Sequence, residues 1–562
     1  MSRISILLSP LIVWGALVAQ ADAQLLSRQT LIDDARQLAR TIEAVHPDPY
    51  LLGGGKIAFH RRLQQTMEAI PDSGMTKDDF FILLAPFVAS VGDAHTVVSD
   101  PHPTDPYSPK GIPLYFETAD NGLYVAAVLR ENHRSLLGAQ LTSIEGLSFQ
   151  DIVGRYRQRR GADNDYFLYR GLGGQGALWS AHSLKTLIPE WVRRDSIRVG
   201  LRLPRNRDTI IVIAVPDFID YASFVSPQTT DMALVNDYML KLQRTDIFYR
   251  FTDSTHHTCW LVIRDLSTYR EAFEIWHSYG IEDRENQARG LFQRYHGSEP
   301  PADIREVIAG LPSATELFRS MVQDMKISGT KNLLVDLSQD GGGNSLLGNI
   351  LIYFLYGKEM VLSVKGRTTE IVKYSHDYFD KFPSPTLEKI NAVRRVPLTV
   401  DGYDFAADYD HFGYPGPRQV TQEFAEMLGR MPTFQKEYES GTYDGHYRPG
   451  NVFVLCDAGT FSSAFFVMYY LKQAGAEIVG IPSAQAGNCF GDIIGFELPN
   501  SGLKYQVSRK YFELFPDDPD RGRVLMPDHL MTYDVMSSYN FDPASLLWFA
   551  LDLLRKRNAS DN

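Results

Sequence analysis

One stretch, residues 451–488, constrains the fold of this chain more than any other part of it. It begins with a short continuous apolar run at 452–455, which is typical of a strand covered on both faces. A turn follows at 457–460, and apolar residues then recur at helical spacing until Gly475, which is expected to end the helix. Ser462 therefore falls where a buried strand leads into the N-terminus of a helix.

A serine at such a junction has two possible roles. Backbone N–H groups at a helix N-terminus point outward and favour negative charge, so the Ser462 hydroxyl could attack a carbonyl while nearby amides stabilise the oxyanion. The alternative is that Ser462 or Ser463 only caps the helix, because serine is a favoured N-cap residue. The segment alone leaves both roles open.

A run of three glycines at 341–343 follows a largely apolar strand predicted at 332–337. Consecutive glycines allow positive φ and a close approach of the backbone, and they can form a nest of amides for an anion. No Gly-Lys-Ser/Thr sequence follows, which excludes a phosphate-binding P-loop. The run is either an oxyanion-binding turn or a tight connection between a strand and a helix.

His95 belongs to the sequence Gly-Asp-Ala-His-Thr at 92–96, directly after a helix predicted at 77–91. This position predicts a side chain that projects from a turn. The alternative is a structural histidine, which is the more common role of an isolated histidine.

The composition excludes several classes of protein. A length of 562 residues is too great for one core, and a net charge of −12 without a long basic run argues against nucleic-acid binding. Three cysteines do not make a disulfide framework. Cys489 is close to Ser462 in the sequence, and we interpret it as a structural thiol, with a site-lining thiol as the alternative.

The pattern along the chain predicts a multidomain α/β protein. An apolar run before Ala-Asp-Ala at 21–23 predicts that residues 1–23 are a secretory signal, and no later segment is predicted to span a membrane. We expect a helical region at 24–105, a β-rich domain at 106–220 whose residues 160–180 are loop, and an α/β core at 221–562. Residues from about 360 to 450 are rich in aromatic side chains and are expected to be an irregular insertion.

The order of the motifs at 92–96, 340–343 and 459–464 resembles the C-terminal-processing (tail-specific) serine peptidase family. The resemblance places Ser462 at the position of the nucleophile. It implies a crotonase-like α/β spiral core, an N-terminal helical region and a PDZ-like domain, whose cadence residues 138–146 share. It implies no metal and no organic cofactor.

The resemblance is closer to the branch that includes the tricorn protease core than to the Ser-Lys branch. No lysine lies at 480–488, where the Ser-Lys branch has one, and His95 matches the histidine base of the tricorn-like branch. That branch also orients its histidine with a glutamate before a stretch similar to 522–528. Asp520 is nearest to this place, with Asp517 and Asp518 as alternatives.

The resemblance also implies an oxyanion hole built from backbone amides. One donor would be the amide of Ser463, and the other would come from the glycine turn, with Gly341 and Gly342 as candidates.

The predicted function is that of an exported, periplasmic or secreted bacterial serine endopeptidase. It would hydrolyse unfolded or C-terminal polypeptide segments through an acyl-enzyme on Ser462, with His95 as general base. Two alternatives are a non-catalytic ligand-binding protein with the same fold and an esterase or amidase for small substrates. The sequence predicts no oligomeric state.

Overall fold

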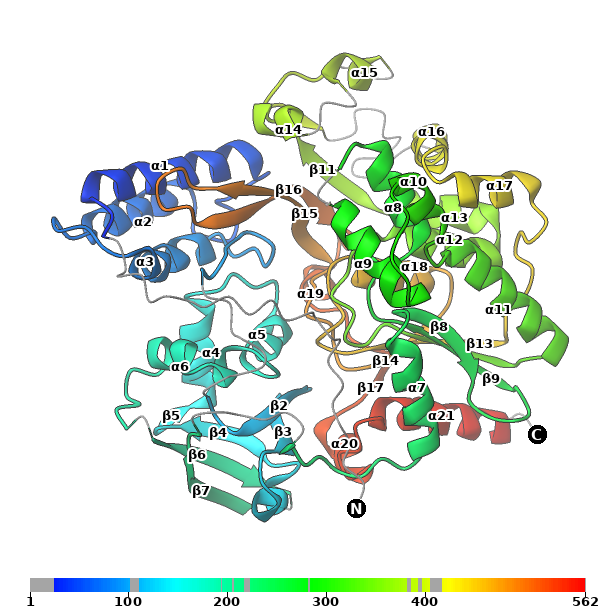
Figure 1. Cartoon of the computed structure of the whole chain (residues 1–562), viewed down its shortest axis with the longest axis horizontal. Coiled ribbons are helices and arrows are strands. Elements are labelled where there is room, and N and C mark those ends of the chain that lie inside the picture. Colours follow the sequence, from blue (N-terminus) through cyan, green and yellow to red (C-terminus); the bar gives the residue numbers. More distant parts are fainter. Residues whose placement is uncertain are drawn as a thin grey trace.

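The computed structural model describes residues 25–101, 111–193, 195–204, 207–216, 223–281, 284–381, 386–392, 397–404 and 417–560. The predicted signal at 1–23 lies outside these residues. The described chain forms three sheets, each of which packs against helices (Figure 1).

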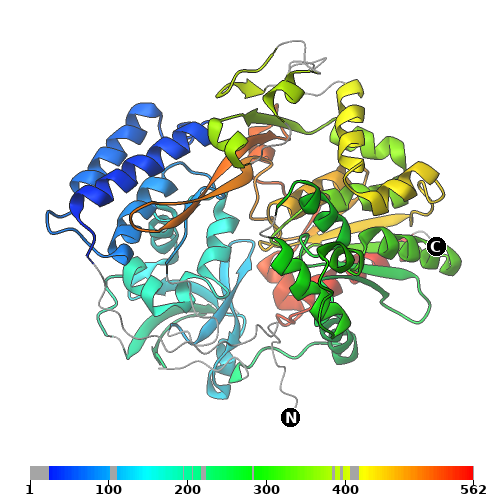
Figure 2. The ribbon, with the colours of Figure 1, turned by 45° about the horizontal axis from the view of Figure 1, so that its top comes forward.

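The N-terminal part is helical, as the apolar spacing predicts. Ser27 caps the first helix and Thr76 caps the third, since each side chain accepts a backbone N–H of the first turn. The buried faces of the three helices share one apolar core with the tip of a long hairpin from the C-terminal half of the chain (Figure 2). The helices are α1 Arg28–Val45, α2 Lys56–Glu68 and α3 Lys77–Ala89, and the hairpin strands are β15 Asn488–Glu497 and β16 Lys504–Glu513.

The second part is an antiparallel sheet in the order β2-β3-β4-β6-β7, with β5 beside β4. Its strands are β2 Leu114–Ala119, β3 Gly122–Val128, β4 Gln140–Ile144, β5 Leu147–Ser148, β6 Ser196–Leu203 and β7 Arg207–Ala214. Its helices are α4 Phe149–Arg157, α5 Asp165–Leu172 and α6 Ala181–Leu187.

The prediction that residues 160–180 are loop is wrong. Helix α5 lies within this range, and Asn164 caps it by accepting the Phe167 N–H at 3.2 Å. Leu168 and Leu172 are four residues apart and both are fully buried. The glycines and arginines around them obscured this short amphipathic pattern.

The third part is the α/β core, built on a six-stranded sheet in the order β17-β14-β13-β10-β9-β8. All neighbouring strands are parallel except β8 and β9. The strands are β8 Ile247–Phe251, β9 Thr258–Ile263, β10 Asn332–Asp336, β13 Asn451–Cys456, β14 Glu477–Gly480 and β17 His529–Leu530.

Helices cover both faces of this sheet, so its strands read as continuous apolar runs. One face packs against α8 Arg270–Ser278, α11 Ala314–Ser328, α12 Leu346–Tyr356 and α18 Ser463–Gln473. The other face packs against α7 Met232–Leu242 and α21 Ser545–Ser560 (Figure 1). Two further helices, α9 Glu285–His296 and α10 Ile304–Ala309, lie beside α8.

The predicted insertion at about 360–450 is less irregular than expected where the structure describes it. Phe424, Leu428, Met431 and Phe434 are buried in the main core, so α16 and α17 are part of the packed molecule. The elements of this region are α13 Lys358–Lys365, β11 Thr369–Lys373, α14 His376–Lys381, α15 Leu387–Asn391, β12 Tyr403–Asp404, α16 Pro417–Leu428 and α17 Pro432–Ser440.

A small sheet in the order β1-β16-β11-β12, with β15 beside β16, joins the helical part to the core. Strand β1 Val97–Val98 follows α3 and pairs with β16, where Val97 lies opposite Gln506. This pairing anchors the segment just before β1, which contains His95, to a hairpin that starts in the core.

Candidate active site

Ser462 lies between β13 and α18, as the sequence predicts. Its backbone adopts φ +54° and ψ −123°, a conformation that non-glycine residues rarely take and that stores strain at functional sites. Its N–H donates to the Gln485 side-chain oxygen at 3.1 Å. Its Oγ lies 3.2 Å from Nε2 of His95, within reach for proton transfer.

The glycine turn lies against this serine because β10 and β13 are parallel neighbours and both turns follow the carboxyl ends of their strands. Gly342 has φ +105°. A Cβ atom on Gly342 would lie 2.8 Å from Cβ of Ser462 and 2.9 Å from the backbone N of Ser463. Only glycine allows this approach.

The substitution Gly342→Ala is therefore expected to displace the nucleophile and to lower kcat/KM by about 100-fold or more, as a small misplacement can. Gly475→Ala is the matched control, since Gly475 also has a positive φ of +97° but a Cβ atom added to it would meet nothing within 4 Å. Both variants carry backbone strain, so a comparable loss of activity in the control would contradict the steric argument. Thermal unfolding of both variants accompanies the kinetics.

The oxyanion donors differ in their availability. The Ser463 N–H belongs to the first turn of α18, where no intrahelical acceptor reaches it. The Gly342 N–H instead donates to Oδ1 of Asp340 at 2.8 Å. Burial raises the pKa of Asp340 to about 8, although this hydrogen bond opposes the shift. Gly341 is exposed beside Gly342 and keeps its predicted place in the turn.

His95 is held by a buried carboxylate two residues before it. Oδ1 of Asp93 accepts the His95 backbone N–H at 2.8 Å and lies 3.9 Å from Nδ1 of the ring. The Gln506 side chain of β16 donates to the His95 carbonyl at 2.8 Å. The ring of Phe461 stacks on the imidazole, with 4.6 Å between centroids. The ring is thus fixed from both sides while Nε2 faces Ser462.

The surroundings keep His95 neutral at neutral pH. Burial is the main cause that lowers the pKa of His95 below 6.5; the Asp93 carboxylate opposes the shift, and Arg160 adds to it. A neutral imidazole is the form that accepts a proton from serine.

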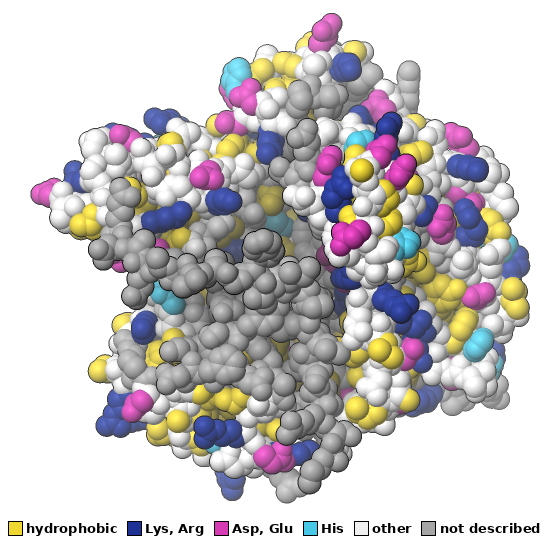
Figure 3. Space-filling model, viewed as in Figure 1, with side chains coloured by type: hydrophobic (Ala, Val, Ile, Leu, Met, Phe, Trp, Pro, Cys, Tyr) yellow, Lys and Arg dark blue, Asp and Glu magenta, His cyan; other side chains and the backbone are white. Residues whose placement is uncertain are grey.

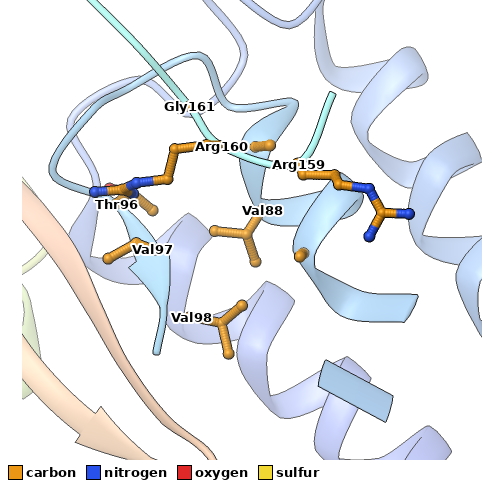
Figure 4. A pocket seen from close by; sticks show the side chains of 9 residues that line it. Val88, Thr96, Val97, Val98, Arg159, Arg160 and Gly161 are labelled. Atoms are coloured by element: carbon orange, nitrogen blue, oxygen red, sulfur yellow. The ribbon is translucent and has the colours of Figure 1, made fainter. Parts of the chain in front are cut away.

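A cavity of about 10 Å³ lies among α3, β1 and the segment that follows α4. Arg160 reaches across it towards Thr96, whereas Arg159 points away (Figure 4). The guanidinium of Arg160 also lies over the Phe167 ring, 5.1 Å from its centroid. The cavity has room for about one water molecule, so it is no substrate pocket.

The structure does not bring Asp520 to the histidine. Asp520 is exposed on the short helix α19 Pro519–Arg523, and within the described chain no hydrogen bond or ion pair joins it to His95. The nearest carboxylate at Nδ1 of His95 is that of Asp93. The resemblance located the acid by its place in the chain, which does not determine its place in the fold.

Two residues of the site were missed from the sequence. Asp93 was visible in the motif at 92–96 but had no assigned role. Gln485 is 1% exposed, and it donates to Sγ of Cys489 at 2.5 Å while its oxygen accepts the Ser462 N–H. Burial raises the pKa of the Cys489 thiol well above its ordinary value, which fits the structural role predicted for it.

The surface of the described residues carries charges of both signs. On the face shown in Figure 3, Lys and Arg side chains are interspersed with Asp and Glu. No helix of the described ranges is long and apolar enough to cross a membrane.

Comparison with known proteins defines the class of this chain as serine-type peptidase. Residues 304–514 match the model of peptidase family S41, and this range contains the glycine turn and Ser462. The chain therefore carries a domain of peptidase family S41, and the predicted resemblance to C-terminal-processing serine peptidases is confirmed. No curated protein sequence matches the chain.

Several solved structures are similar to the chain over most of its length at low sequence identity. Mature CPAF is 14% identical, with a TM-score of 0.50 over 92% of this chain and 96% of CPAF. The photosystem II D1 C-terminal processing protease is 10% identical, with a TM-score of 0.38 over 91% of this chain and 95% of that protease. Tricorn protease is 12% identical, with a TM-score of 0.31 over 94% of this chain and 37% of tricorn. The similarity to CPAF shows a shared fold.

Proposed function

We propose that the chain is an exported endopeptidase that cleaves unfolded or C-terminal polypeptide segments through Ser462 and His95. The observation that carries the proposal is the distance of 3.2 Å between Oγ of Ser462 and Nε2 of His95, at a helix N-terminus and beside a glycine turn. His95 accepts the serine proton, and the alkoxide attacks the peptide carbonyl. The protonated imidazole then gives its proton to the leaving amine, and water hydrolyses the acyl-enzyme.

Backbone amides stabilise the tetrahedral intermediate in this proposal. Ser463 supplies one donor from the first turn of α18, and the glycine turn supplies the second. The N–H of Gly341 is the candidate there, because Gly342 donates to Asp340. Loss of one such donor costs about 3 to 4 kcal/mol of transition-state stabilisation.

Asp93 takes the role that the sequence analysis gave to Asp520. Its carboxylate faces Nδ1 of His95, which stabilises the imidazolium that forms during the reaction. Burial disfavours the charged form, but His46, His95 and Ser508 more than offset it and hold the pKa of Asp93 well below its usual range.

The pH dependence of kcat/KM tests these roles. The acid limb is expected to have its midpoint below pH 6.5, because activity requires neutral His95, whose pKa is lowered. Asp93→Asn removes the group that opposes this shift, so the midpoint moves to still lower pH while the plateau falls about 10- to 100-fold. Asp528→Asn is the control, since Asp528 pairs with Lys472 away from the site. A midpoint that moves to higher pH in Asp93→Asn would contradict the assignment.

Two further parts of the proposal concern the rest of the chain. Residues 1–23 direct export to the periplasm or the medium, and the N-terminal residue of the mature protein checks this cleavage. The α/β part is a crotonase-like core, and the β2–β7 sheet is a PDZ-like module.

Peptide binding at the β2–β7 sheet is supported by its edge strand β7, where Ile210 and Val212 are 69% and 66% exposed. Ile210→Lys is expected to raise KM for a long unfolded polypeptide by about threefold or more and to leave a short peptide unaffected. An equal effect on both substrates would contradict a role in binding.

Substrate class is tested by comparing an unfolded protein such as casein with a small ester. The proposal expects casein fragments that include internal cleavages. Hydrolysis of the ester alone would favour the esterase alternative. Inertness towards both, in a folded protein, would favour a ligand-binding protein.

A further inference from the structure

A second histidine lies behind the proposed catalytic pair. His46 directly follows α1, and its side chain is 0% exposed. Its Nδ1 accepts the backbone N–H of Asp48 at 3.1 Å, so the ring proton of the neutral form is on Nε2. This Nε2 lies 3.4 Å from Oδ2 of Asp93.

Asp93 therefore lies between two histidines. Oδ1 faces His95, and Oδ2 faces His46 and accepts the hydroxyls of Thr96 and Ser508 at 2.5 Å each. The Asp93 side chain is fully buried. A buried carboxylate is costly unless its oxygens are paired, so each of these partners helps to fix its position and its charge.

The packing around His46 restricts its movement. Its ring contacts Phe490 of β15, with 4.3 Å between centroids. Phe490 lies next to Gly491, where a Cβ atom would be 3.7 Å from the His95 ring. The same strand thus contacts His46 and passes beside His95.

We propose that His46 is a positioning residue for the reaction proposed above and that it acts on His95 through Asp93. The hydrogen of His46 Nε2 holds Oδ2 of Asp93, which leaves Oδ1 directed at the backbone N–H and the Nδ1 side of His95. Without it, the carboxylate turns towards its hydroxyl partners, and His95 is held less well opposite Ser462. The inference rests on the proposed function.

Two polar variants of similar size separate this role from simple packing. His46→Asn keeps an acceptor near the position of Nδ1 for the Asp48 N–H but loses the group that faces Asp93. His46→Gln places its amide donor near the position of Nε2. We expect kcat for an unfolded polypeptide to fall about tenfold in His46→Asn with KM within about twofold, and most of the loss to be recovered in His46→Gln. His60→Gln, at a partly exposed histidine bound to Glu43, is the control.

The rate at which a fluorophosphonate labels Ser462 is the second readout, because it reports activation of the serine without peptide binding. It is expected to fall in His46→Asn and to recover in His46→Gln. Labelled wild type with equal rates in both variants would overturn the inference and leave the proposed function intact. Wild type that neither cleaves polypeptide nor takes the label at Ser462 would overturn the proposed function, and this inference with it.

Discussion

Ser462→Ala is expected to abolish polypeptide cleavage, with a fall in kcat on the order of 10⁴-fold or more. Alanine keeps the backbone but removes the only atom that can form the acyl-enzyme. The fold should persist, because Oγ has His95 as its one side-chain partner and the Ser462 N–H still reaches Gln485. The measurement is the release of casein fragments, followed beside thermal unfolding.

Ser463→Ala is the matched control for this variant. Ser463 donates its hydroxyl to the Gly343 carbonyl at 2.8 Å, but its proposed role in the reaction belongs to its backbone amide, which alanine retains. Its activity is expected to stay within about tenfold of wild type. A Ser463→Ala variant as inactive as Ser462→Ala, or a Ser462→Ala variant that still cleaves, would reject Ser462 as the nucleophile.

His95→Ala is expected to have the second largest effect, again on the order of 10⁴-fold in kcat. The serine then has no base within hydrogen-bond distance, since Nε2 of His95 is the group that its Oγ contacts. The residual activity should also lose the acid limb of wild type, because the ionisation that causes it is gone. The measurement is the pH profile of kcat/KM on the same substrate.

The outcome that contradicts this prediction is specific. If His95→Ala cleaves at nearly the wild-type rate while Ser462→Ala fails, the nucleophile is correct and the base lies elsewhere. A fall in activity that accompanies a large fall in melting temperature would instead indicate a structural histidine, since the ring packs on Phe461.

Local patterns were enough to predict the parts of the site that each element carries by itself. Ser462 follows from an apolar strand that leads into a helix, and the Gly342 turn follows from a glycine run after another such strand. His95 was found because its sequence motif resembles a known one, although 367 positions separate it from Ser462 in the chain. The long hairpin that brings it to the core was predicted only as a pair of strands.

The partners of these residues could not be predicted, because long-range packing places them. Gln485 reaches Ser462 from the loop after β14, and His46 reaches Asp93 from the end of α1. Neither contact leaves a pattern in the sequence. The error on Asp520 has the same cause, since an acid chosen by its distance along the chain need not lie beside His95.

The helical parts that were predicted as irregular show a different limit. Helix α5 is short, and α16 and α17 lie among tyrosines, prolines and glycines that favour a loop prediction. Burial of one face decides their structure. The cap at Asn164 was the one local signal for α5.

The most direct test of the account is to map the site of a fluorophosphonate adduct by peptide mass spectrometry and to measure its rate of formation against pH. The account predicts a single adduct on Ser462, a rate that rises with a midpoint below pH 6.5, and loss of labelling in His95→Ala. An adduct on another residue, or a labelling rate at Ser462 that is the same without His95, would contradict the pairing of this serine with this histidine.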